Sequence, residues 1–385
     1  MRVQDLLQLI PDEELNVLAV ETHVDHQVKK LTGVIMFQLI LFSMINRKRI
    51  SLRVMEGFLK STSFRKLSNQ ADIDAKFNSL SDRISMIRAD YFEKIFYSVY
   101  DKFSKHLDEK NSITRYDSTM VAVSSKLFNW GMKVGPQSSK TEKLQIKFTI
   151  GMHGSLPSHL EVFSQQSHLA EDVALSKAIL NDPKSREKPV VFDRGLKAKK
   201  VFEEFSNKDI LFVTRCNPNA RYIKKSSNEI CDKPLDSTVT ITEDLLVKLK
   251  YDFKKENGNT YRLIKGRIDA SGEEIIFLSN MMELSSYEIA ATYKLRWQIE
   301  VFFKFLKQEL NVEHMVSRDP NGVKVMMYMS LIASILIIAF RKLNKISSYK
   351  IAKLRFALEL ENTMIGQIVM LCGGDINKFN EIYGP

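Results

Sequence analysis

Residues 293–300 read Tyr-Lys-Leu-Arg-Trp-Gln-Ile-Glu, and Lys307 follows seven residues after the Glu. They belong to the segment Ser286 to Leu310, which contains no Gly or Pro and is long enough for about seven helical turns. On one continuous helix, the Tyr, the Arg, the Glu and Lys307 share a stripe about 60° wide beside the apolar face. This pattern is compatible with an amphipathic helix that carries surface ion pairs. It is also compatible with a phosphate-handling site, in which a carboxylate is flanked by two cations and a phenol.

The composition indicates a folded soluble protein with a basic surplus. A chain of 385 residues suggests two or three domains, and its apolar (44%) and charged (27%) fractions are ordinary for globular proteins. The formal net charge of +11 makes polyanions plausible partners. Cys216, Cys231 and Cys372 show no metal-ligand spacing and are too few for a disulfide framework, so a reducing compartment is expected.

Two apolar runs, Val34–Ile45 and Val325–Phe340, raise the question of a membrane. Each is shorter than the roughly 18–20 residues that a spanning helix needs, so both are predicted to be buried core helices. No secretory signal is expected, because residues 1–31 mix charges throughout and lack an apolar core. These patterns predict a protein without a membrane partner.

Residues 1–108 are predicted to be helical, with a buried helix at 29–46 and a long helix at 80–103. Seven basic residues against one acid lie between Arg47 and Lys66. With a turn at about 61–78, this region is compatible with a DNA-reading module of helix-turn-helix type. The alternative is a solvated basic face on a packing domain.

From residue 112 the pattern changes to an alternation of strands and helices. Helices are expected at 170–180 and 197–205. Runs that are β-branched, alternating or wholly apolar predict strands at 113–123, 143–150, 160–164, 189–193 and 210–214. This order predicts a mixed α/β sheet covered by helices.

The segment 216–281 interrupts that pattern with turn signals, among them Asn257-Gly258, a good hairpin signal. Strands are predicted at 237–242, 245–253, 260–268 and 274–278, so the segment is interpreted as an all-β insertion. The predicted domains are a helical, DNA-binding N-terminal domain (1–108), a catalytic core (109–215 and 282–345), the insertion (216–281) and a basic C-terminal tail (346–385). The last ten residues are expected to be a loop or a frayed end.

Three acids occupy places that suit a catalytic site. Asp117 lies mid-strand, Asp193 ends a buried strand at the carboxyl edge of the predicted sheet, and Glu300 belongs to a helix expected to pack on that sheet. Each has a plainer alternative, because a strand-end Asp often caps a turn and a mid-strand Asp can face solvent. Together they suit two Mg²⁺ ions, which activate an attacking oxygen and stabilise a leaving oxygen at phosphorus. The neighbouring cations and phenol would then hold phosphate oxygens.

These residues resemble the DDE transposases of bacterial insertion sequences. The matching runs are Asp117-Ser118-Thr119, Val191-Phe192-Asp193-Arg194-Gly195 and Tyr293-x2-Arg296-x3-Glu300-x6-Lys307. The last run matches, in every spacing, the signature of the insertion sequence four family. The likeness covers about residues 112–310. It implies a ribonuclease-H-like core that is interrupted by a β-rich insertion between the second Asp and the Glu.

The resemblance also implies roles for individual side chains. The catalytic metals, two Mg²⁺ ions for which Mn²⁺ substitutes, would be bound by Asp117, Asp193 and Glu300. DNA near the cleaved end would be held by Tyr293, Arg296 and Lys307, with Arg194 and Trp297 as further DNA-binding candidates.

The implied activity is transposition, in which the element's ends are nicked by hydrolysis and the freed 3′-hydroxyl attacks target DNA, in some members through a hairpin intermediate. The expected partners are double-stranded DNA, at the ends and at the target, and a second copy of the chain in a synaptic homodimer. The expected location is the bacterial cytoplasm, on the nucleoid when DNA is bound. Two alternatives stay open: a ribonuclease-H-like nuclease that cuts without joining, and a transposase-derived DNA-binding protein that has lost catalysis.

Overall fold

The structure is a computed structural model and describes residues 2–68, 73–107, 113–123, 130–134, 143–250, 258–310 and 312–383. The chain forms two compact units. Unit 1 contains the described residues up to 107 and those from Phe303 onward, and unit 2 contains those from 113 to Phe302.

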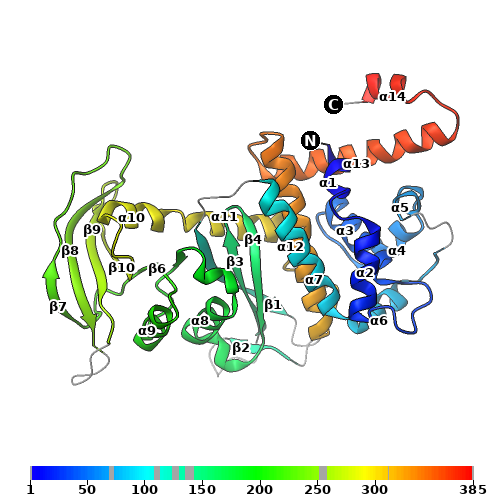
Figure 1. Cartoon of the computed structure of the whole chain (residues 1–385). Helices are drawn as coiled ribbons and strands as arrows, with labels where there is room; N and C mark the ends of the chain where they lie inside the picture. Colours follow the sequence, from blue (N-terminus) through cyan, green and yellow to red (C-terminus); the bar gives the residue numbers. More distant parts are fainter. Residues whose placement is uncertain are drawn as a thin grey trace. The chain divides into compact units, whose positions relative to one another are not determined.

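Unit 2 is built on one ten-stranded sheet (Figure 1). Its strands follow the order β2-β3-β1-β5-β6-β10-β9-β8-β7, with β4 also paired to β3. The first six strands along the chain are β1 (Thr114–Val123), β2 (Met132–Val134), β3 (Lys143–His153), β4 (Leu156–Phe163), β5 (Val190–Phe192) and β6 (Phe212–Arg215). The other four are β7 (Tyr222–Ser227), β8 (Val239–Leu249), β9 (Tyr261–Ile268) and β10 (Glu274–Ser279).

The directions of the strands confirm the predicted α/β fold class. β3 runs antiparallel to both β1 and β4, whereas β1, β5 and β6 are parallel. This is the mixed, ribonuclease-H-like sheet that the sequence predicted. The β-rich insertion continues the same sheet, because β10 pairs antiparallel with β6.

Within the insertion, two strand predictions were wrong. Parts of the runs 237–242 and 245–253 belong to one strand, β8 (Val239–Leu249), whose register against β9 shifts between Ile241 and Glu243, and residues 251–253 lie outside the described part of the chain. A β-bulge of this kind absorbs the break in alternation without ending the strand. β7 was not predicted at all, because its residues are mostly exposed and polar. The Asn257-Gly258 turn begins at a residue outside the described part of the chain.

Helices cover both faces of the sheet, and the apolar side chains form a separate core on each face. The helices are α8 (Glu171–Asn181), α9 (Lys199–Asn207) and α10 (Ser286–Lys294), and α11 (Trp297–Glu309) follows α10 along the chain. Val190 and Phe192 pack with residues of α8 and α9, whereas the intervening Val191 packs with residues of α10. Because successive side chains of a strand point to opposite faces, the short apolar strand β5 supplies both cores. Figure 1 shows α8 and α9 on one side of the sheet and α10 on the other.

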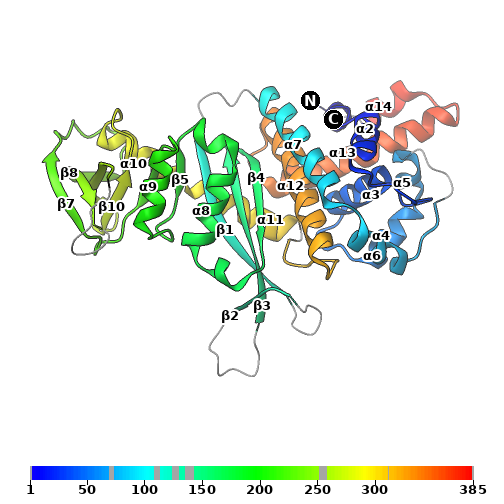
Figure 2. The ribbon, with the colours of Figure 1, turned by 60° about the horizontal axis from the view of Figure 1, so that its bottom comes forward.

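Unit 1 is helical, as predicted for the N-terminal region (Figure 2). Its central helix is α12 (Pro320–Leu343), which packs against helices from both ends of the chain, including α3, α7 and α13. The other helices are α1 (Val3–Leu7), α2 (Asp12–Thr22), α3 (Gly33–Asn46), α4 (Leu52–Leu59), α5 (Thr62–Leu67), α6 (Phe77–Met86), α7 (Ala89–His106), α13 (Tyr349–Leu371) and α14 (Ile376–Tyr383).

The apolar run Val325–Phe340 is a core helix, as predicted, although α12 is longer than the run. By length and composition α12 could cross a membrane, but 94% of its most apolar window is buried inside the protein. The prediction of one helix at 80–103 was wrong, because α6 and α7 are separate. The prediction of a loop or frayed end over the last ten residues was also wrong, because α14 occupies most of them.

Candidate active site

The first two acids lie where β1 and β5 part. These parallel strands pair over only two residues of each, the last being Arg115 with Val191. The same register, continued for two residues, sets Asp117 beside Asp193 just after β5 has ended. Both acids are therefore at the carboxyl edge of parallel strands, where sheets of this class place their sites.

Asp117 is a partly buried acid with other negative charges around it. Its Oδ1 accepts a hydrogen bond of 2.8 Å from the Ser118 N–H. The pKa of Asp117 is raised to about 6, chiefly by burial and also by Glu171 and Asp193, against the opposing effects of Ser118 and Arg296. A cation bound here would offset the repulsion between Asp117 and its acidic neighbours Glu171 and Asp193.

Tyr293 holds the second acid. Its hydroxyl donates a hydrogen bond of 3.0 Å to Asp193 Oδ1, and its ring packs against Phe277 with the centroids 5.3 Å apart. Burial, together with the charge of Asp193, raises the pKa of the Tyr293 phenol well above its usual range. The phenol therefore stays protonated and acts as a hydrogen-bond donor to Asp193.

Arg296 links the other two acids. Its guanidinium donates a hydrogen bond to Glu300, and its Nη1 lies 3.8 Å from Asp117 Oδ2. The guanidinium carbon is 5.9 Å from the centre of the Tyr293 ring. Its Nε is buried and has no hydrogen-bond partner among the described residues. Arg296 thus has a donor left over at the point where the predicted site residues meet.

The predicted single helix over 286–310 was wrong. α10 ends at Lys294 and α11 begins at Trp297, with Leu295 and Arg296 in a turn between them. Arg115, a buried side chain of β1, donates a hydrogen bond of 2.7 Å from Nε to the Leu295 carbonyl. A partner 180 residues away in the sequence therefore supports the break, and no local pattern signals it.

The break changes how the four motif residues are arranged. Tyr293, Arg296 and Glu300 still meet near Asp117 and Asp193, although they do not lie on one continuous helix. Lys307 lies on the part of α11 that belongs to unit 1, and its ammonium is 3.8 Å from Glu313. Trp297 is 63% exposed at the start of α11.

A further acid, Glu171 at the start of α8, was not predicted. One of its oxygens lies 2.8 Å from the ammonium of Lys147, and the other accepts a hydrogen bond of 3.0 Å from Ser118, next to Asp117. Lys147 belongs to the polar set of the alternating strand β3, and its side chain is buried. Gly195 approaches Glu171 so closely that a Cβ at this position would lie 3.0 Å from the Glu171 Cγ.

The donor set suits a hard divalent cation in its chemistry. Asp117, Asp193 and Glu300 offer carboxylate oxygens, the preferred ligands of Mg²⁺. Burial is the main cause of the raised pKa of Asp117, and a cation bound beside this acid would favour its charged form. Within the described residues, no three His, Cys, Asp or Glu side chains are grouped closely enough to hold a metal as they stand. Arg296, which contacts both Asp117 and Glu300, supplies the positive charge in this arrangement.

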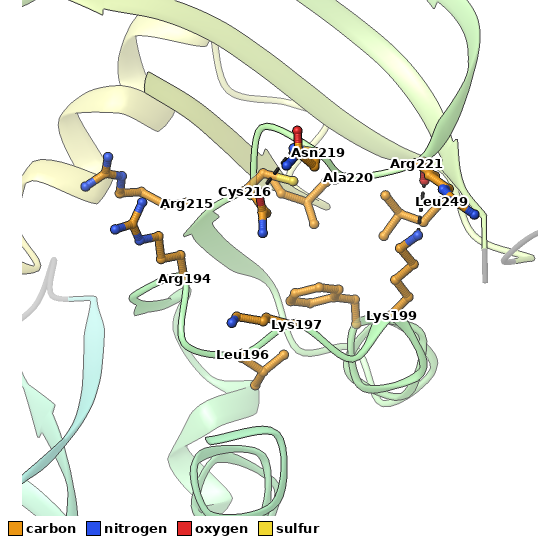
Figure 3. Close-up of a pocket in the computed structure, with 13 residues that line it drawn as sticks. Arg194, Leu196, Lys197, Lys199, Arg215, Cys216, Asn219, Ala220, Arg221 and Leu249 are labelled. Atoms are coloured by element: carbon orange, nitrogen blue, oxygen red, sulfur yellow. Dashed lines mark hydrogen bonds between the residues drawn. The ribbon is translucent and has the colours of Figure 1, made fainter. Parts of the chain in front are cut away.

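A basic pocket of about 290 Å³ begins at the residue after Asp193 (Figure 3). Its apolar wall includes Phe202 and Leu278, and Cys216 and two Asn side chains contribute to the lining. The cations that line it come from the loop after β5, from α9 and from the region around the end of β6; they are Arg194, Lys197, Lys199, Arg215 and Arg221. None of its lining residues is acidic, so the pocket suits an anionic ligand.

Comparisons with known proteins place the chain in a family. A family model described as the transposase DDE domain matches residues 108–336. A probable transposase for insertion sequence element IS5377 of Geobacillus stearothermophilus is 25% identical over 222 residues, which are 57% of this chain and 54% of that protein. A protein of Synechocystis sp. that carries the name of a transposase for insertion sequence element IS4SA is 23% identical over 252 residues, which are 64% of this chain and 66% of that protein.

A solved structure, a piggyBac transposase synaptic complex with hairpin DNA, aligns with a TM-score of 0.43 and 11% identity over 86% of this chain and 71% of that one. The chain spans about half the length of the first of these relatives and about two thirds of the second. The family model covers more than half of the chain, and the predicted resemblance is confirmed: this chain belongs to the family of proteins that carry a transposase DDE domain.

Proposed function

We propose that the protein is a DNA transposase that cleaves the ends of an insertion element and joins them to target DNA. The observation that carries this proposal is the meeting of Asp117, Asp193, Arg296 and Glu300 at the edge where β1 and β5 part. In a chain of the transposase DDE family, this site provides the carboxylates that phosphoryl transfer needs.

The proposed cofactor is Mg²⁺, as two ions, with Mn²⁺ as a substitute. Asp117, Asp193 and Glu300 would hold the ions, which activate the attacking oxygen and stabilise the leaving oxygen of an in-line displacement. Tyr293 orients Asp193 through its hydrogen bond, and Lys147 with Glu171 fixes Ser118 beside Asp117. These neighbours hold the carboxylates in place before DNA arrives.

The proposed DNA contacts are side chains near the three carboxylates that can donate hydrogen bonds to phosphate oxygens. Arg296 is a proposed phosphate contact, and Arg194 and Arg215 bring two more guanidinium groups from the adjacent pocket. In Figure 3 both of these side chains extend toward the same side. Tyr293, Trp297 and Lys307 are further proposed contacts with DNA near the cleaved end.

The remaining partner and domain assignments are also proposals. We infer that residues 1–108 help to bind DNA and that the core (109–215 and 282–345) carries the chemistry. The insertion (216–281) and the basic C-terminal tail (346–385) are the other two proposed parts. Two copies would act together on paired element ends, in the bacterial cytoplasm.

Cleavage and joining of DNA test the catalytic assignment. The substrate is labelled duplex DNA that carries the sequence flanking the coding region, incubated with the purified chain and Mg²⁺. Asp193→Asn and Glu300→Gln should each lower the rate of nicking by about a thousandfold or more while the chain still binds the DNA. Asp232→Asn, at an exposed acid of the insertion, is the matched control and should leave nicking unchanged.

Nicking that survives in Asp193→Asn would overturn the site assignment. Nicking by the parent without any joined product would instead favour the nuclease that cuts without strand transfer.

The salt dependence of DNA binding tests the DNA-binding residues separately. Removing one side chain that binds a phosphate should reduce this salt dependence by about one counterion. Arg194→Ala and Arg215→Ala should both show this reduction, and an unchanged slope would remove them from the DNA-binding set.

A further inference from the structure

Helix α9 begins without the features that usually start a helix. Its N-cap residue is Ala198, whose side chain makes no capping hydrogen bond. Its first turn contains no acid and opens with Lys199 and Lys200, and Lys197 comes just before it. Because the N-terminal end of a helix carries partial positive charge, these cations are unfavourable there. The start of α9 therefore needs an anionic acceptor from elsewhere in the fold.

Asp172, in the first turn of α8, supplies this acceptor. Its Oδ1 accepts a hydrogen bond from the Lys197 N–H and another, of 2.6 Å, from the Ala198 N–H, 26 residues further along the chain. Figure 1 and Figure 2 both show α8 and α9 beside each other. Asp172 does not line the basic pocket, whereas Lys197 does, so the carboxylate binds this loop from outside the pocket. It acts as a capping group that one helix supplies to the next.

Glu171, the residue before Asp172, makes contacts on the other side of the active site. One of its oxygens accepts the hydrogen bond of 3.0 Å from Ser118, the residue after Asp117. The buried ammonium of Lys147 lies 2.8 Å from the other oxygen and also donates a hydrogen bond of 2.7 Å to the Leu169 carbonyl, just before α8. Lys147 thus fixes the start of α8 to strand β3 at two points.

The two neighbouring acids connect the segments that carry the first two carboxylates of the site. Glu171 binds the residue after Asp117, and Asp172 binds the loop that follows Asp193. Gly195, in the same loop, leaves room for the Glu171 side chain, since an added Cβ would lie 3.0 Å from its Cγ. Both connections come from a single helical turn, which is itself anchored to the sheet.

We propose that Asp172 is a positioning residue of the active site, through which the first turn of α8 holds the segments after Asp117 and Asp193 at a fixed separation. Without Asp172, the loop 194–198 loses the carboxylate that fixes its end next to α9, and both Asp193 and Arg194 gain freedom to move. A displacement of about 1 Å at a reacting group can slow a reaction by about a hundredfold. The proposal rests on the proposed function, because it concerns the same carboxylates.

Binding of Mn²⁺ to the full chain without DNA tests this role by isothermal titration calorimetry. The relevant ion is the one whose binding is lost in Asp193→Asn. Asp172→Ala should raise its dissociation constant by about tenfold, without changing the number of ions bound, because a support and not a ligand is removed. Asp269→Ala should leave the affinity unchanged. It is the matched control, since Asp269 is an exposed acid of the insertion whose carboxylate also accepts two hydrogen bonds.

A conservative variant separates a hydrogen-bond acceptor from a metal ligand. Asp172→Asn keeps an oxygen that can accept from the Lys197 and Ala198 N–H groups, so its Mn²⁺ dissociation constant should stay within about threefold of that of the parent. An unchanged affinity in Asp172→Ala would overturn the proposal. An Asp172→Asn variant as weak as Asp172→Ala would overturn it too, because the charge would then matter more than the acceptor.

Hydrogen exchange of the full chain tests the same connection without any metal. In Asp172→Ala the backbone N–H groups of residues 194–198 should exchange about tenfold faster, while those of β10 keep their parent rates. Faster exchange confined to α9 would show that Asp172 only caps that helix, and would overturn the positioning role. Neither measurement uses DNA, so failure of this proposal leaves the proposed function standing. A chain that shows both effects but never cleaves DNA would contradict the transposase alone.

Discussion

The two units bury polar groups to very different extents. In unit 1, the central helix α12 buries only apolar and small residues over most of its length. In unit 2, charged side chains are buried close to the sheet in bonded sets, among them Arg262 with Asp244 and Lys147 with Glu171. Apolar burial supplies stability with little directional demand, whereas each buried charge must be met by a partner at a defined place. The difference indicates that unit 1 is built for stability and unit 2 for fixed geometry.

The largest expected effect concerns the buried pair in unit 2. Asp244 and Arg262 have side chains that are 1% and 5% exposed, and Arg262 also donates to the carbonyls of Met281 and Leu284, just before α10. Asp244→Ala should lower the free energy of unfolding of unit 2 by about 3–5 kcal/mol, because it leaves a guanidinium buried without its acid. Both Trp residues, Trp130 and Trp297, belong to unit 2, so tryptophan fluorescence during urea unfolding reports this change.

Replacing both partners sharpens the same test. An Asp244→Leu, Arg262→Met double variant removes the two charges together and should recover most of the lost stability. A double variant as unstable as Asp244→Ala would contradict this expectation. It would show that the attraction between Asp244 and Arg262 exceeds the free-energy cost of burying their two charges.

The next effect belongs to unit 1. Leu331 lies in the middle of α12 and is fully buried. Leu331→Ala should lower the free energy of unfolding by about 3 kcal/mol through reduced burial and the cavity it leaves. Helical circular dichroism should report this destabilisation, since unit 1 is helical, while the fluorescence transition of unit 2 should not move. A shift of both transitions together would contradict the separation of the two units.

Lys353 is an exception to the apolar core of unit 1 and gives a pH test. Its ammonium donates to the carbonyls of Arg47 and Glu309, and burial lowers the pKa of Lys353 to about 8. Between about pH 8 and pH 10.5 the unfolded chain therefore holds this proton more than the folded chain, so stability should rise with pH over that window. The gain, of the order of 2 kcal/mol, should disappear in Lys353→Met. Parallel pH curves for parent and variant would contradict it.

The smallest expected change in stability is at Tyr293. Tyr293→Phe keeps the ring that packs on Phe277 and removes the hydrogen bond to Asp193. It should cost about 1 kcal/mol of stability and slow DNA cleavage by about tenfold. Tyr287→Phe, at another buried Tyr of the same apolar core, is the control and should leave cleavage unchanged. Equal effects of the two variants on cleavage would show that Tyr293 has no special role in geometry.

Features encoded in short runs could be predicted from the sequence. The apolar strand that ends at Asp193, the strand around Asp117 and the buried helix at Val325–Phe340 were all found where the patterns indicated. In each case a continuous run of apolar or alternating residues fixes both the element and its burial.

Features that depend on distant partners could not be predicted. The break before Arg296 is supported by Arg115, and Glu171 approaches Ser118 only after α8 has packed on the sheet. Lys147 is buried although it belongs to the polar set of its alternating strand, because α8 covers the face that would otherwise meet water. The three carboxylates, Tyr293 and Arg296 were thus predictable as residues of the site, but the supporting side chains Arg115, Lys147 and Glu171 were not.

Unit 1 is assembled from both ends of the chain, and this has a consequence for biosynthesis. Its N-terminal helices, among them the buried α3, pack on α12, which a ribosome reaches only after it has synthesised all of unit 2. At ordinary bacterial elongation rates that interval is roughly 20 s. During it, unit 2 is being synthesised, while the apolar sides of α3 and α7 still lack the helix that covers them. The nascent N-terminal helices are therefore expected to bind chaperones until translation passes Leu343.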